Sequence, residues 1–143
     1  KKSKVPEGSA DILFTTGTTG KSKGVIISHE AVMANSENLI EAHKYDEALS
    51  FIICGPLNHY GSWSKVFPCI IKGMTVILLD GIKIMDDLFR AIDSAEGRVA
   101  TFMVPSSIKI LMLMSSEKLS EYADKIAFIE TGGAPMSESD MNN

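Results

Sequence analysis

The sequence predicts a three-layer α/β domain, in which a mostly parallel sheet has helices on both faces and an antiparallel hairpin lies near the start of the chain. Two observations support this fold class. Short apolar runs are continuous rather than alternating, as in strands buried on both faces of a parallel sheet. Between them the hydrophobic period becomes helical, so strand and helix alternate. We expect residues 1–143 to form a single α/β subdomain.

The expected strands are these apolar runs, including the first, which we expect to be buried on both faces. The second run follows the first too closely for a helical crossover, so these two are expected to pair as the antiparallel hairpin. The expected strands are 11–15, 24–28, 51–54, 75–79, 99–104 and 126–129.

Helical spacing predicts a helix in each longer connection. Ser28 is the expected N-cap of a helix that ends near Tyr45, and a later helix opens at Pro105. Another lies between Asp86 and Gly97, behind two acidic residues. The helix that ends at Gly73 is expected to turn an apolar stripe inward, formed by Trp63, Val66, Phe67, Ile70 and Ile71.

Composition narrows the classes of function. With 45% hydrophobic and 22% charged residues, the chain has the composition of a globular protein, and no apolar run reaches the length of a membrane span. Its 14 basic and 18 acidic residues give a net charge of −4, which argues against nucleic acid as a partner. Cys54 and Cys69 lack metal-ligand spacing, so we expect free thiols in a reducing, cytoplasmic setting.

A loop rich in hydroxyl groups, glycine and lysine connects the two strands of the expected hairpin. Glycines let backbone N–H groups form a concave nest, hydroxyls donate hydrogen bonds and lysine adds positive charge, which together suit a polyphosphate. A flexible hairpin turn is the simpler alternative. A Walker A loop is excluded, because Thr15 replaces its first glycine and a strand, not a helix, follows. The loop residues are Thr15, Thr16, Gly17, Thr18, Thr19, Gly20, Lys21, Ser22, Lys23 and Gly24.

The stretch from Phe14 to Val25 resembles the phosphate-loop signature of the adenylate-forming superfamily, which includes acyl- and aryl-CoA synthetases, luciferases and peptide synthetase adenylation domains. Residues 56–61 are similar to its Pro-x-x-His-x-x-Gly segment, with glycine one place early, and residues 132–137 to its Gly-Gly-Ala-Pro-Leu-Ser segment. Three matches in the family's order are more specific than one. Each follows an expected strand, so all three are expected to share one edge of the sheet.

The resemblance implies a role for each segment. The loop would bind the β- and γ-phosphates of ATP while a substrate carboxylate attacks the α-phosphorus and pyrophosphate leaves. The backbone of Gly133, Ala134 and Pro135 would pass along adenine, and His59 would lie near the acyl carboxylate. Lys23 and His59 are the candidate catalytic residues, and no metal ligand is assigned. The residues implied to bind phosphate are Thr15, Thr16, Gly17, Thr18, Thr19, Gly20 and Lys23.

The family's later segments do not occur before Asn143. These are an aromatic-Gly-x-Thr-Glu run for adenine and magnesium, a ribose-binding aspartate, and a lysine on a mobile C-terminal domain. The chain starts at Lys1 and stops soon after Ser137, an expected helix N-cap. We therefore expect a piece of the larger N-terminal domain, without the C-terminal domain. Alone it should be inactive, bind ATP weakly at best, and self-associate through exposed strand edges.

The leading hypothesis is part of the ATP-binding core of a carboxylate-activating ligase that forms acyl-AMP and then transfers the acyl group to CoA, as in fatty acid metabolism. A peptide synthetase adenylation domain is the alternative within the family, and the His59 segment favours the CoA ligase. A flavodoxin-like module that binds a ligand or partner without chemistry is the alternative outside it. Replacing Lys23 in the longer enzyme separates these classes, because only a ligase has adenylation to lose.

Overall fold

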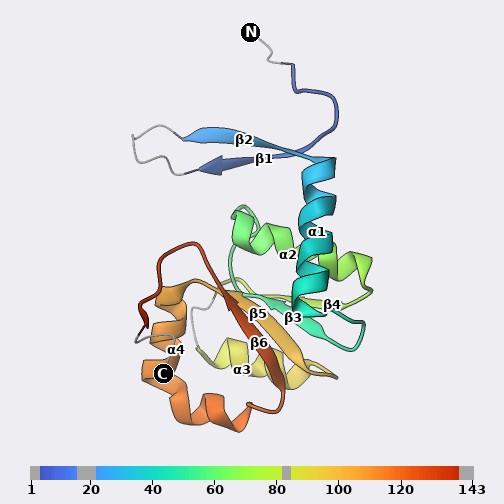
Figure 1. Cartoon of the computed structure of the whole chain (residues 1–143). Coiled ribbons are helices and arrows are strands. Elements are labelled where there is room, and N and C mark those ends of the chain that lie inside the picture. The colour runs from blue at the N-terminus through green and yellow to red at the C-terminus, as the bar shows by residue number, and fades with distance from the viewer. Residues whose placement is uncertain (1–3, 16–21, 82–84, 139–143) are drawn as a thin grey trace.

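The computed structural model describes residues 4–15, 22–81 and 85–138 (Figure 1). Within these ranges the chain forms a two-stranded antiparallel sheet and a four-stranded parallel sheet, flanked by helices. The α/β class and the alternation of strand and helix are confirmed. The elements are β1 (Ser9–Thr15), β2 (Lys23–Ser28), α1 (His29–His43), β3 (Ser50–Ile53), α2 (Tyr60–Ile71), β4 (Thr75–Leu78), α3 (Met85–Ser94), β5 (Val99–Met103), α4 (Pro105–Glu121) and β6 (Ile126–Thr131).

The four-stranded sheet has the order β4-β3-β5-β6, and every neighbouring pair is parallel. Each step from one strand to the next in sequence passes through a helix, as parallel pairing requires. All residues of β3 are buried, which explains why its sequence is apolar without alternation. The central position of β3 and β5 in the sheet therefore agrees with the continuous apolar runs that predicted these two strands.

Helices cover both faces of this sheet, so the three-layer arrangement is confirmed (Figure 1). On one face Phe89 of α3 and Leu111 of α4 pack against Ile52. On the other face, Phe51 and neighbouring sheet residues pack against Cys69 of α2 and against partly buried residues of α1. Successive residues of β3 thus serve opposite layers of the core.

The hairpin of β1 and β2 is confirmed, but the expected burial of its first strand is wrong. The hairpin forms a sheet of its own, with Thr15 opposite Lys23, and the Phe14 side chain is 70% exposed. It joins the rest of the chain at α1, where the His29 N–H donates to the Gly8 carbonyl over 2.9 Å (Figure 1). A continuous apolar run shows that a strand favours burial, but it does not show which surface covers it.

The start of α1 follows the predicted capping. The Ala31 N–H donates to Ser28 Oγ at 3.1 Å, which satisfies one of the free donors of the first turn. The helix ends at Lys44, whose left-handed backbone (φ 54°) stops it. Among the described residues, no helix is both long enough and apolar enough to cross a membrane.

The face that α2 turns inward differs in part from the prediction, because Val66 of the expected stripe is partly buried against the core but Ile70 and Ile71 are not. Ile70 and Ile71 are 68% and 47% exposed, whereas small or charged residues face the core. Small side chains let the helix approach the sheet closely, and the charge of the buried lysine is compensated by a carboxylate on β6. Helical periodicity alone could not reveal this compensation. The buried residues of α2 are Ser62, Ser64, Lys65, Pro68 and Cys69.

Candidate active site

The carboxyl ends of β3, β5 and β6 lie at one edge of the parallel sheet, which we call the rim (Figure 1). The chain leaves β3 into residues 54–59 and then enters α2, leaves β5 directly into α4, and leaves β6 into residues 132–135. Ligand crevices of open α/β sheets lie outside such strand ends. The rim therefore brings together two of the three predicted segments, 56–61 and 132–137.

Phe102 of β5 joins these two segments. A methyl group placed on Gly61 would lie 2.5 Å from Phe102 Cε1, and one placed on Gly132 would lie 3.5 Å from Phe102 Cε2. The ring thus packs against the backbone of Gly61 and lies in van der Waals range of Gly132. The glycine that comes one place early in the His59 segment lies where this ring leaves no room for a side chain.

The turn after β6 exposes its backbone. Gly133 has φ +84°, a conformation that residues other than glycine rarely adopt, and it lies beside Val104. Gly133, Ala134 and Pro135 are all exposed. Because their side chains are small or absent, a flat ligand can approach this backbone closely.

His59 stands at the N-terminus of α2 as its N-cap residue. Its backbone N–H donates to the Pro56 carbonyl at 3.0 Å, and its carbonyl accepts from Trp63 N–H at 2.9 Å, so the main chain is fixed. The imidazole forms no cap hydrogen bond and lines a hollow of about 280 Å³. The hollow is also lined by Cys54, Gly55, Pro56, Ser62, Phe102, Met103, Val104 and Ser107.

Cys54 lies in this hollow but is a poor nucleophile. Burial raises the pKa of its thiol. Thr101 Oγ1 donates to the Ile52 carbonyl at 2.8 Å, which leaves it to accept from Cys54 Sγ at 3.4 Å. The thiol is therefore protonated at neutral pH, so it is a wall of the hollow rather than a reacting group.

The first predicted segment does not lie on the rim, because β1 and β2 belong to the separate sheet. Thr15 and Lys23 are exposed at its end, and Ser22 Oγ donates to the Thr15 carbonyl at 2.9 Å. The expectation that all three segments share one edge of a single sheet is wrong. The remaining predicted phosphate-binding residues lie outside the described residues, namely Thr16, Gly17, Thr18, Thr19 and Gly20.

A buried ion pair near the rim was missed by the sequence analysis. Lys65 Nζ lies 2.6 Å from Glu130 Oε1, and their side chains are 6% and 19% exposed. The available signals were a lysine followed by Val66 and Phe67 in a helix, and a glutamate directly after the apolar run 126–129. Their partnership could not be inferred, because 65 positions separate them.

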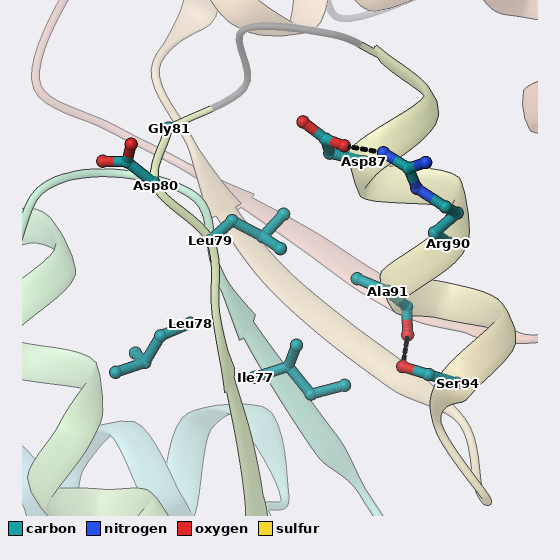
Figure 2. A pocket seen from close by; sticks show the side chains of 9 residues that line it. All are labelled: Ile77, Leu78, Leu79, Asp80, Gly81, Asp87, Arg90, Ala91 and Ser94. Carbon is teal, nitrogen blue, oxygen red and sulfur yellow. Dashed lines mark hydrogen bonds and ion pairs between the residues drawn. The ribbon is translucent and has the colours of Figure 1, made fainter.

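Another hollow, of about 440 Å³, lies between the end of β4 and α3 (Figure 2). It contains none of the predicted site residues. Within its lining, Asp87 pairs with Arg90, and Ser94 Oγ donates to the Ala91 carbonyl at 2.8 Å. In the part of the chain that the structure describes, no group of three or more His, Cys, Asp or Glu residues could hold a metal ion.

The family model of the AMP-binding enzymes matches residues 1–143, the whole chain. The chain belongs to the AMP-binding enzyme family. One AMP-binding relative is 4-coumarate–CoA ligase-like 3 of Arabidopsis thaliana, which is 26% identical over 140 residues, or 96% of this chain and 25% of the relative. Another is the nonribosomal peptide synthetase TES of Alternaria alternata, 26% identical over 118 residues, or 77% of this chain and 2% of the relative.

Solved structures of AMP-binding enzymes share the fold. O-succinylbenzoate coenzyme A synthetase of Bacillus subtilis in complex with AMP aligns with a TM-score of 0.81 and 25% identity, covering 94% of this chain and 27% of that one. ATP-bound MatB of Rhodopseudomonas palustris aligns with a TM-score of 0.80 at 23% identity, covering 92% and 25%. The chain thus spans about a quarter of the length of 4-coumarate–CoA ligase-like 3 and of these two solved structures.

Membership of the AMP-binding family favours one of the predicted classes of function. The relatives are CoA ligases and peptide synthetases, which supports an adenylate-forming ligase and argues against a flavodoxin-like module without chemistry. Both alternatives within the family, the CoA ligase and the peptide synthetase, have relatives of this chain.

Proposed function

We propose that the chain is part of the N-terminal, ATP-binding core of a longer carboxylate-activating ligase, called here the complete enzyme. The reaction joins a carboxylic acid to ATP to give acyl-AMP and pyrophosphate, and then transfers the acyl group to CoA. The observation that carries this proposal is the rim, where the His59 segment and the exposed turn after β6 meet at Phe102 beside a hollow. CoA ligase relatives support it.

The nucleotide would lie between the turn after β6 and the hairpin. The exposed backbone of Gly133, Ala134 and Pro135 suits the flat face of adenine. The Lys23 ammonium suits the negative charge of the β- and γ-phosphates. The other residues proposed to bind phosphate are Thr15, Thr16, Gly17, Thr18, Thr19 and Gly20.

The acid would enter the hollow beside His59. Its walls at Phe102, Met103 and Val104 are apolar, which suits the tail of a fatty or aryl acid, while the imidazole can donate a hydrogen bond to the carboxylate. Positioning the carboxylate for in-line attack on the α-phosphorus is the main contribution expected from these residues.

Pyrophosphate exchange tests this function. We expect the complete enzyme to exchange pyrophosphate into ATP only when a fatty or aryl acid is present, and to consume CoA afterwards. The isolated 143-residue chain should show no exchange, because it spans only about a quarter of the length of its CoA ligase relatives. Exchange that depends on amino acids and forms no CoA thioester would favour a peptide synthetase domain. No exchange with any acid would refute the proposal.

The isolated chain is also proposed to self-associate. Within the described sheet, β4 and β6 each pair on one side only, and several large apolar side chains are exposed. We expect the average mass in sedimentation equilibrium to rise over an about hundred-fold range of concentration, since exposed edges favour dimers. A constant monomer mass would contradict this. The exposed side chains include Ile70, Ile71, Leu78, Leu113 and Met114.

A cytoplasmic location is a further proposal. Cys54 and Cys69 are both buried and free, as expected for a protein in a reducing compartment. The net charge of −4 favours small-molecule substrates over nucleic acid as partners.

A further inference from the structure

We infer that the Lys65–Glu130 ion pair is a positioning device that fixes α2, and with it His59, relative to the turn after β6. It connects the two segments that we propose to hold the acid and the nucleotide, so its catalytic consequence rests on the proposed function. Neither residue lies in a signature segment, and neither is among the residues that we propose to bind the acid or ATP. The ion pair contributes by holding the proposed substrate-binding residues, His59 and the turn after β6, at a fixed distance from each other.

The pair lies directly behind the rim. Lys65 is within two helical turns of His59, and Glu130 is followed at once by Thr131 and Gly132. Lys65 Nζ is 2.6 Å from Glu130 Oε1 and 5.3 Å from the centre of the Phe102 ring. Because that ring packs against Gly61 and Gly132, ion pair, ring and both glycines form one connected contact between helix and strand.

The second oxygen of the carboxylate extends this contact to α1. Glu130 Oε2 is buried, has no hydrogen bond to the described residues, and lies 3.6 Å from His43 Nε2. The His43 ring stacks on Phe128, with 4.8 Å between ring centres. One carboxylate on β6 therefore meets basic groups from both helices of this layer.

The neighbouring ionisable groups do not compete for Lys65. Burial, followed by the charge of Glu130, raises the pKa of Tyr45 far above its usual value. Burial also raises the pKa of Cys69 to about 12, although Lys65 opposes this shift. Both groups are neutral at physiological pH, which leaves Glu130 as the anion that lies against Lys65.

Stability alone is a weak reason for such a pair. Removing two charges from water costs about as much as their attraction returns, so apolar residues of similar volume are often equally stable. An ion pair differs from an apolar contact in being directional, because a hydrogen bond at this distance weakens steeply when its geometry changes. The charged pair therefore fixes the distance between α2 and β6, which an apolar pair would not do.

The test replaces both charges in the complete enzyme with apolar residues, Lys65→Met together with Glu130→Leu. We expect a folded protein with a thermal midpoint close to that of the wild type. Its kcat for adenylate formation should fall by about 10- to 100-fold, since displacement of reacting groups by about 1 Å has effects of this size. The KM values should change little, because each binding segment remains intact. A folded double variant with wild-type kcat would overturn the inference.

Two further measurements keep the test decisive. The matched control is Lys118→Met with Asp86→Leu, which removes an exposed ion pair between α4 and α3 and should leave kcat unchanged. Glu130→Gln keeps the shape and one acceptor oxygen, so a smaller loss of kcat is expected if the double variant does not fold. Wild-type kcat in this variant would likewise count against the pair.

Hydrogen exchange separates this inference from the proposed function. Backbone amides of residues 131–138 should exchange faster in the charge-free double variant than in the wild type, whatever the enzyme catalyses. Unchanged exchange rates would overturn the positioning role. Faster exchange in an enzyme that forms no adenylate would refute the proposed function and leave the positioning role standing.

Discussion

Replacing Lys23 with alanine in the complete enzyme is expected to lower acid-dependent pyrophosphate exchange by about 100-fold, a typical cost of removing one group that stabilises transition-state charge. Lys23 is exposed at the start of β2, and its backbone is fixed by pairing with Thr15. Its ammonium group would offset the negative charge that moves onto the leaving pyrophosphate. Initial rates of exchange at saturating ATP and acid measure the effect.

Lys72→Ala is the matched control for this experiment. Lys72 is also exposed, but it stands at the opposite end of α2 from His59, so its removal should leave the rate within about twofold, as for most surface substitutions. Thermal melting should confirm that both variants fold equally well. If Lys23→Ala retains the wild-type rate, the assignment of the hairpin to the phosphates fails.

Lys65→Met alone is expected to lower the free energy of unfolding by about 3–5 kcal/mol, because it leaves the Glu130 carboxylate buried without its partner. Urea unfolding of the variant and the wild type measures this difference. Adding Glu130→Leu to the same chain should restore most of the loss, since no uncompensated charge then remains.

The exposed pair of α4 and α3 provides the comparison. Lys118 and Asp86 have side chains that are 44% and 67% exposed, with 2.9 Å between Nζ and Oδ1. Water solvates either charge when the other is removed, so Lys118→Met should change stability little. Equal losses in Lys65→Met and Lys118→Met would show that burial of the first pair has no special energetic consequence.

Local signals in the sequence predicted most of the fold. Continuous apolar runs located all four strands of the parallel sheet, and Ser28 and Pro105 marked the starts of α1 and α4. These signals depend on neighbours in the chain, which is why one sequence suffices to read them. The position of the separate hairpin was harder to predict, because an apolar residue such as Phe14 does not indicate which other part of the protein it packs against.

The sequence predicted which segments form the candidate site, but it did not predict the side-chain contacts between them. The motifs located His59 and Gly133, and the parallel strands explain why those two segments meet. The packing of Gly61 on Phe102 and the pairing of Lys65 with Glu130 depend on residues far apart in the sequence. The burial of Lys65 on the inward face of α2 could not be predicted for the same reason, since only the glutamate on β6 makes a buried lysine acceptable.

The packing of Phe102 against two glycines has a consequence for enzyme engineering. The Phe102 ring separates the start of α2, which follows His59, from the glycine turn after β6. Exchanging it for a shorter aliphatic residue would enlarge the hollow in which we propose the acid's tail to lie, while His59 and the glycine turn are left unchanged. Substrate scope could therefore be redesigned at one wall residue that no signature motif marks.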